Sequence, residues 1–198
     1  VAYGGKYGAR ARDCAISEGV PVLSFDADGE TRLMETYVTR GYCQQVSFTK
    51  GAQLFETERS RLFDTVRDML PALDLVTVNG TAAGADDDVL AARIIALCRA
   101  QSVPVWLDSR SATLRRCLAE KPDLCKPNIE ELAEASGVPL PEWDGKSDPP
   151  EELIYAARAL NAKETVLSLG AYGAVWCAED ETVAARAPEV ETVNATGS

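Results

Sequence analysis

From residue 73 onward, the sequence alternates short apolar runs with helical patterns. The runs at residues 73–78 and 103–107 have the length of buried strands, and the segment between them carries apolar residues at helical spacing. Another helical pattern begins at about Ala112. Strands that alternate with helices pack as a mainly parallel sheet covered by helices and joined by right-handed crossovers. We therefore expect an α/β fold for this part of the chain.

Late in the chain, the sequence favours strands joined by tight turns. Such runs occur at residues 165–169, 174–177 and 182–185. Because tight turns connect neighbouring strands in opposite directions, we expect the sheet to change here from parallel to antiparallel pairing.

The segment between residues 136 and 150 is rich in proline, glycine and polar residues, which predicts a surface loop. At its end, Asp148 and Glu151 flank two prolines, a pattern typical of a capping box at a helix start. In the first third of the chain we expect helices at residues 9–17 and 30–39 and a strand at residues 20–25.

Charge and composition exclude several classes of function. A net charge of −11 argues against nucleic acid or an anionic membrane as the main partner, because both bind basic surfaces. The chain has no histidine, which removes Ser-His and Cys-His nucleophile pairs and the usual zinc ligands. No apolar run long enough to span a membrane and no signal peptide occur, so we expect a cytoplasmic protein. The six cysteines show no Cys-x-x-Cys pairing and mostly lie in apolar segments, as reduced core thiols do.

Residues 122–132 are the segment in which we most expect a functional site. Pro127 presets the backbone where a strand end turns into an acidic helix, so Asn128 and Glu131 lie about one helical turn apart and face the same space. Asn-x-x-Glu is also a common pattern for a helix start that caps itself, so a purely structural role stays open. Asp108 ends a neighbouring strand, where open α/β sheets contact ligands, and it could equally cap the next helix.

Glycine-rich turns are further candidates for close ligand contact. Gly4, Gly5 and Lys6 precede a helix, and their amides and cation could cradle an anion, although a flexible chain end explains them equally well. Residues 80–84 form a small-residue loop after a strand, and residues 168–174 join two strands. A plain turn and a hairpin are the alternatives for these two segments.

Together and in this order, these elements resemble the ribokinase-like (PfkB) family of carbohydrate kinases, most like its branch of 1-phosphofructokinases and tagatose-6-phosphate kinases. Residues 122–131 match the family's Pro-Asp-Leu-x-Lys-Pro-Asn-x-x-Glu almost letter for letter. Residues 4–12 resemble Gly-Gly-Lys-Gly-x-Asn-x-Ala-Arg, residues 80–84 a shortened Gly-Ser-Leu-Pro-Pro-Gly, residues 107–109 Leu-Asp-Thr-Ser, and residues 168–174 Ser-Leu-Gly-x-x-Gly-Ala. The resemblance implies a three-layer α/β/α fold with a mainly parallel central sheet, as a single sugar-kinase domain over residues 1–198.

The resemblance also implies a transferase that moves a phosphoryl group from ATP to a hydroxyl of a sugar or sugar phosphate. Asn128 and Glu131 would help hold Mg²⁺ with the nucleotide phosphates, and Lys126 would contact a phosphate. A carboxylate suits a hard cation that keeps part of its hydration shell. The remaining implied contacts are Ser168, Gly170 and Gly173 with the nucleotide, and Gly4, Gly5, Lys6 and Asp108 with the sugar or its phosphate.

The chain departs from the family pattern at three places. The family continues with Gly-x-Gly-Asp, in which backbone amides stabilise the transferring phosphoryl group and the aspartate activates the sugar hydroxyl. Here Gly197 begins that anion hole and the sequence stops at Ser198. Ala9 stands where the early motif has asparagine, and the segment near residues 44–57 is too short for the usual lid.

From these departures we expect a piece of a longer protein, with the catalytic aspartate beyond Ser198 and the lid shortened or missing. The alternative is a non-catalytic relative that binds a sugar, a nucleotide or a protein partner. Because the lid often supplies the dimer contact in this family, we expect a homodimer.

Overall fold

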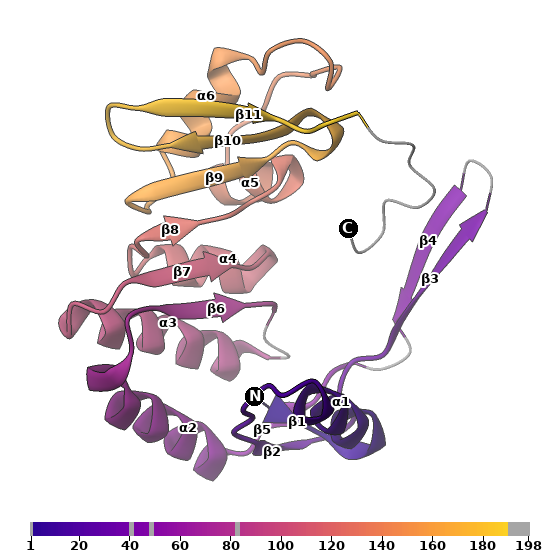
Figure 1. The fold of residues 1–198 in the computed structure, drawn as a ribbon, viewed down its shortest axis with the longest axis vertical. Coiled ribbons are helices and arrows are strands. Elements are labelled where there is room, and N and C mark those ends of the chain that lie inside the picture. Colours follow the sequence, from indigo (N-terminus) through magenta and orange to yellow (C-terminus); the bar gives the residue numbers. More distant parts are fainter. Residues whose placement is uncertain (1, 40–41, 48–49, 82–83, 190–198) are drawn as a thin grey trace. The chain divides into compact units, whose positions relative to one another are not determined.

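The computed structural model describes residues 2–39, 42–47, 50–81 and 84–189 (Figure 1). The chain divides into two compact units. Of the described residues, those up to 65 and 84–87 form the first unit, and those at 66–81 and 88–189 form the second. The single sugar-kinase domain expected from the sequence stays a prediction.

A six-stranded sheet forms the centre of the second unit, with the strand order β11-β10-β9-β8-β7-β6. Neighbouring strands from β6 to β9 pair parallel, whereas β9, β10 and β11 pair antiparallel. This confirms the predicted change from parallel to antiparallel pairing. The strands are β6 (Val76–Asn79), β7 (Val105–Asp108), β8 (Leu124–Cys125), β9 (Glu164–Ser168), β10 (Gly173–Cys177) and β11 (Thr182–Arg186).

Helices cover this sheet and close its core. Between β8 and β9 the chain forms two helices, and α4, α5 and α6 pack side by side against the strands (Figure 1). The core between them is apolar: Leu107, Leu132 and Leu167 are fully inaccessible to solvent. Burying such side chains supplies the main driving force for folding. The helices are α3 (Ala85–Ala100), α4 (Ser111–Leu118), α5 (Ile129–Ser136) and α6 (Glu151–Arg158). The α/β fold class is confirmed.

The first unit contains a small sheet in the order β1-β2-β5. β1 (Ala2–Tyr3) pairs parallel with β2 (Phe25–Asp28), and β5 (Gln53–Leu54) pairs antiparallel with β2. α1 (Gly5–Ser17) connects β1 to β2, which confirms the helix expected at residues 9–17 and extends it toward the N-terminus. The strand expected at residues 20–25 lies further along the chain, because β2 begins at Phe25, the last residue of the expected range.

The helix predicted at residues 30–39 is wrong. Met34–Thr39 is a strand, β3, which pairs antiparallel with β4 (Tyr42–Ser47) in the register that joins Thr39 to Tyr42. The sequence of β3 is rich in β-branched and aromatic residues, which favour a strand once a partner is present. The described residues of the segment 44–57 contain the end of β4, β5 and the start of α2 (Glu56–Met69), and the shortened or missing lid expected there stays a prediction.

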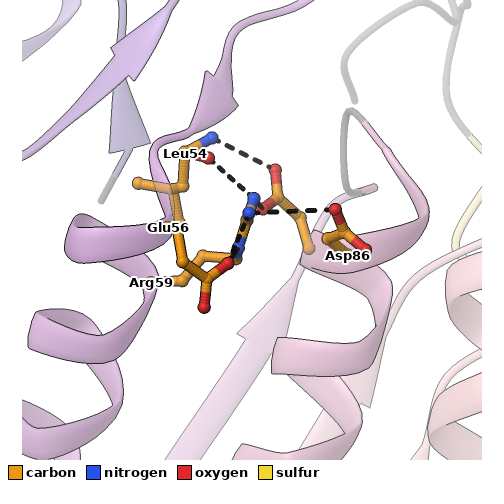
Figure 2. A network of polar contacts seen from close by, with 5 residues as sticks. Leu54, Glu56, Arg59 and Asp86 are labelled. Atoms are coloured by element: carbon orange, nitrogen blue, oxygen red, sulfur yellow. Dashed lines mark hydrogen bonds and ion pairs between the residues drawn. The ribbon is translucent and has the colours of Figure 1, made fainter.

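Arg59 ties α2 to the first turn of α3 within the first unit (Figure 2). Its guanidinium donates to the carbonyl of Leu54 at 2.7 Å and to Asp87 at 3.3 Å, and it pairs with Glu56 at 2.8 Å. Asp87 also accepts from the amide of Leu54 at 3.4 Å. The acidic start of α3 therefore neutralises a specific arginine, in addition to the favourable contact with the helix dipole.

The capping box predicted at Asp148 and Glu151 is also wrong. The N-cap of α6 is Pro150, and no side chain caps this helix. Asp148 lies two residues before the N-cap, and its carboxylate accepts from Tyr172 and Arg186 instead. A fixed φ at Pro150 starts the helix without a side-chain acceptor.

The cysteines mostly follow the prediction of reduced core thiols. Cys98, Cys117, Cys125 and Cys177 are buried with free thiols, whereas Cys14 is exposed. In the part of the chain that the structure describes, no helix has both the length and the apolar character needed to cross a membrane.

Candidate active site

Asp108 and Lys126 form an ion pair at the carboxyl ends of β7 and β8. Lys126 Nζ lies 3.1 Å from Asp108 Oδ2, and both side chains are 46% exposed. The backbone brings them together because β7 and β8 pair parallel and the amide of Lys126 donates to the carbonyl of Leu107 at 2.9 Å. Solvent screening makes such a pair weak, so an incoming anion could recruit Lys126 at small cost.

Asn128 and Glu131 form a reciprocal capping box at the start of α5. Glu131 N donates to Asn128 Oδ1 at 2.8 Å, and Asn128 N donates to Glu131 Oε2 at 2.9 Å. Asn128 and Glu131 therefore have the helix-capping role that the sequence left open. Among the described residues, none bonds to Glu131 Oε1 or Asn128 Nδ2. The cap thus leaves one carboxylate oxygen of Glu131 available to a ligand.

Ser168 ends β9 beside this helix start. A parallel β-bridge joins Ser168 to Asn128, and the amide and hydroxyl of Ser168 both donate to the carbonyl of Pro127, at 2.9 Å and 3.2 Å. The glycine turn that follows is thereby fixed next to Asn128. The structure confirms that the ends of β7, β8 and β9 lie at one edge of the sheet, as the parallel pairing requires.

The turn after β9 requires both of its glycines. Gly170 has φ +57 and begins the short 3-10 helix η2 (Gly170–Tyr172). Gly173 has φ +127, and a Cβ added there would lie 2.0 Å from the carbonyl oxygen of Ala185. A side chain is excluded at Gly173 by backbone conformation and by contact. The turn therefore exposes backbone near the edge that Lys126 and Asn128 share.

The loop after β6 reaches the same edge at its first residue. Gly80 N donates to the carbonyl of Asp108 at 2.9 Å, and Ser109 Oγ donates to the carbonyl of Gly80 at 2.6 Å. These bonds fix the start of the small-residue loop predicted at residues 80–84 beside the end of β7.

Cys125, which precedes Lys126, is fully buried under this edge. Burial raises the pKa of its thiol to about 12, and the carboxylates of Asp108 and Glu131 act in the same direction. The thiol is therefore neutral at physiological pH and takes no part in nucleophilic chemistry.

In the first unit, the glycine-rich start of α1 binds a carboxylate from its own chain. Glu30 accepts from the amides of Lys6 and Tyr7, each at 3.2 Å. Its carboxylate lies over Gly5, where an added Cβ would approach it to 2.2 Å. The amides at the start of α1 thus bind a carboxylate of the same chain, and their predicted contact with a sugar or its phosphate stays a prediction. No local sequence signal indicates Glu30, because this residue lies 24 positions from Lys6.

The predicted site residues are divided between the two units. Asp108, Lys126, Asn128, Glu131, Ser168, Gly170 and Gly173 belong to the second unit. Gly4, Gly5 and Lys6 belong to the first unit. Gly197, the predicted start of the anion hole, lies outside the described residues.

The donors at this edge fit a hydrated magnesium ion better than a metal held by protein alone. Within the described ranges, no group of three or more metal-ligating side chains occurs. Mg²⁺ usually keeps several waters and is held by one or two carboxylates together with substrate phosphates. Glu131 Oε1 and Asn128 could hold such an ion through its waters, and Lys126 could contact the phosphate oxygens.

Comparison with known proteins identifies relatives over nearly the whole chain. The sequence pattern described as "pfkB family carbohydrate kinase" matches residues 4–198. Phosphofructokinase-2 from Escherichia coli in complex with potassium is 24% identical with a TM-score of 0.78, over 96% of this chain and 61% of that chain. The same enzyme with fructose-6-phosphate is 23% identical with a TM-score of 0.77, over 99% of this chain and 64% of that chain. A possible 1-phosphofructokinase from Thermotoga maritima is 15% identical with a TM-score of 0.70, over 91% and 57%. The chain thus spans about three fifths of the length of these structures, which share its fold.

Proposed function

The chain belongs to the pfkB family of carbohydrate kinases, and from this we propose that it carries the nucleotide and sugar sites of an ATP-dependent sugar or sugar-phosphate kinase. The reaction would transfer the terminal phosphoryl group of ATP to a hydroxyl of the sugar. One observation supports the proposal most directly: Asn128, at the start of α5, is bridged to Ser168, at the start of the glycine turn. The two family motifs are thereby neighbours.

In this proposal, each group at the sheet edge has a separate task. Lys126 leaves Asp108 and contacts phosphate oxygens as a point charge. The free carboxylate oxygen of Glu131 and the side chain of Asn128 hold hydrated Mg²⁺ with the nucleotide phosphates. When bound, Mg²⁺ supplies charge neutralisation on those phosphates. The turn from Ser168 to Gly173 offers backbone close to the nucleotide.

The sugar and the acid–base chemistry are assigned by family pattern. Gly4, Gly5, Lys6 and Asp108 would contact the sugar or its phosphate, and Gly197 would begin the anion hole that receives the transferring phosphoryl group. An aspartate after Ser198 in the complete protein would accept the proton of the sugar hydroxyl. Lys126 would hold the nucleotide phosphates in place through its charge, and positioning of this kind dominates phosphoryl transfer.

The proposed metal role of Glu131 can be tested separately from its capping role, because glutamine at this position also forms a capping box. Glu131→Gln keeps the hydrogen bond to Asn128 N but removes the carboxylate charge. If Glu131 helps hold Mg²⁺, this variant keeps its stability and loses Mg²⁺-dependent nucleotide binding and phosphoryl transfer. The neighbouring exposed residue gives a matched control, Glu130→Gln, which leaves both unchanged. Undiminished Mg²⁺-dependent activity in Glu131→Gln would exclude this residue from the metal site.

A non-catalytic binding protein is the second candidate, and one contact favours it. Glu30 occupies the amides at the start of α1, so groups expected to receive the sugar or its phosphate are already satisfied. Calorimetry with MgATP and a panel of sugars, run beside a coupled assay for ADP release, separates the candidates. Sugar or nucleotide binding without phosphoryl transfer by the complete protein would support this second function.

A further inference from the structure

Tyr172 lies at the centre of an aromatic and charged cluster beside the glycine turn. It is the last residue of η2 and only 5% exposed. Its ring meets the ring of Trp143 edge to face, with centroids 5.3 Å apart. The guanidinium of Arg186, at the end of β11, lies 4.5 Å from the centroid of the same ring. Contacts of both kinds stabilise a ring in one orientation.

The hydroxyl of Tyr172 is also fixed, by a hydrogen bond to Asp148. It donates to Asp148 Oδ1 at 3.1 Å, and Arg186 Nη2 donates to the same oxygen at 2.6 Å. Burial raises the pKa of Tyr172, and the bond to Asp148 acts in the same direction. The bond from Arg186 and the bond from Tyr172 lower the pKa of Asp148. At neutral pH the arrangement is therefore a protonated phenol and a cation that share one carboxylate oxygen.

The backbone of the turn is closed on itself and bonded to the residue that follows β11. Leu169 N donates to the carbonyl of Gly173 at 2.9 Å, and Ala187 N donates to the carbonyl of Tyr172 at 2.8 Å. The absence of a side chain at Gly173 lets the carbonyl of Ala185 approach closely. The loop at Asp148 and the end of β11 thus hold the turn from two separate parts of the chain.

We propose that Tyr172 is a positioning residue for nucleotide binding, which holds the Gly170–Gly173 turn in its phosphate-accepting shape through Asp148 and Arg186. The inference rests on the proposed function, in which this turn approaches the nucleotide. Backbone groups bind phosphate well only when they are already oriented, because ordering a loop on binding costs free energy. Tyr172 itself need not touch the nucleotide, since it acts through the turn.

The test compares the full-length wild-type protein with variants that lack single side chains of the Tyr172 cluster. Binding of MgADP is measured by calorimetry, and folding is checked by urea unfolding. Tyr172→Leu weakens MgADP binding about ten-fold, and Tyr172→Phe, which keeps the ring, weakens it about three-fold. Tyr155→Leu, an exposed tyrosine of α6, is the matched control and binds as the wild type does.

If Tyr172→Leu does not fold, variants of Arg186 provide the test instead. The side chain of Arg186 is 59% exposed, so replacing it leaves the buried core intact. Arg186→Gln weakens MgADP binding, and Arg186→Lys, which keeps the charge near Asp148, restores part of the affinity. A purely structural contact would change the unfolding free energy and leave the affinity of the folded protein unaltered.

Trp143 supplies a spectroscopic readout of the same contact. In a Trp106→Phe, Trp176→Phe background its indole is the one left in residues 1–198, and any tryptophan outside them is replaced in the same way. MgADP then changes the emission of Trp143 unless Tyr172 is replaced by leucine. Wild-type protein that binds MgADP while Tyr172→Leu and Arg186→Gln bind within two-fold of it overturns this inference alone. Failure of the wild type to bind MgADP overturns the proposed function and this inference with it.

Discussion

Asn128 and Glu131 donate their backbone amides to each other's side chains at the start of α5. Because this box satisfies two amides that the helix itself leaves unpaired, it stabilises the turn that carries Lys126 and Asn128. The pair therefore combines a structural role with the metal-holding role proposed for it, and conservative variants separate the two.

Replacing the cap residues is expected to destabilise the protein by a predictable amount. Asn128→Ala and Glu131→Ala each lower the free energy of unfolding by about 1 kcal/mol, because each leaves one helix-start amide without an acceptor. Glu131→Gln stays within about 0.5 kcal/mol of the wild type, since the amide oxygen replaces the carboxylate oxygen. Urea unfolding of the three variants checks this, and equal losses in Glu131→Gln and Glu131→Ala would contradict it.

Asp123 is expected to make the stability of the second unit sensitive to acid. Burial raises the pKa of its carboxyl, but the bonds from Lys163 and from Val105 N outweigh that effect and hold the pKa below its usual value. The stabilisation is fully present above the unfolded pKa of about 3.9 and is lost as pH falls through the lower folded value. Urea unfolding between pH 6 and pH 2 should show a smaller acid loss for Asp123→Asn. The exposed control Asp180→Asn should follow the wild type.

Gly173 should tolerate alanine far less well than another glycine with positive φ. Gly145 has φ +71 and open space around its Cβ position, so Gly145→Ala costs about 1 kcal/mol of backbone strain. Gly173→Ala adds a clash with the carbonyl of Ala185 and costs about 3 kcal/mol or more. Thermal unfolding of the two variants measures the difference. Equal effects would mean that the end of β11 does not approach the turn this closely.

The cysteines should differ widely in reactivity. Burial raises the pKa of Cys117 and of Cys125 to about 12, so neither thiol ionises near neutral pH, whereas Cys14 is exposed. A thiol reagent at pH 8 should label Cys14 within minutes and leave Cys117 and Cys125 unlabelled until the protein is unfolded. Peptide mass spectrometry identifies the labelled positions. Fast labelling of Cys125 in the native protein would show that the sheet edge opens.

Glu30 is expected to stabilise the start of α1. Glu30→Ala leaves the amides of Lys6 and Tyr7 without this acceptor and lowers the free energy of unfolding by about 1 kcal/mol. The matched control is Glu18→Ala at the other end of α1, where a carboxylate opposes the helix dipole. That change should be neutral or slightly stabilising. Hydrogen exchange at the Lys6 and Tyr7 amides reports the loss directly, and unchanged exchange would contradict the contact.

Much of the second unit could be predicted from the sequence, because its signals are local. The apolar run that ends at Asp108 and the Pro127 turn mark strand ends that the structure confirms. Parallel pairing then brings these ends to one edge. The first unit could not be predicted as well. Residues 30–39 were expected to form a helix, but Met34–Thr39 is strand β3, because strand formation depends on a pairing partner, here β4.

The sequence by itself determined the order of the elements in the second unit and the residues at its strand ends, because periodicity and turn chemistry act over a few neighbouring positions. The order of its motifs indicated the family. Only the tertiary structure decided which side chains satisfy those turns. Glu30 lies 24 positions from Lys6, and Arg186 lies 38 positions from Asp148, distances at which no local pattern operates. Such contacts form when packing brings distant segments together and places a donor beside an acceptor from another part of the chain.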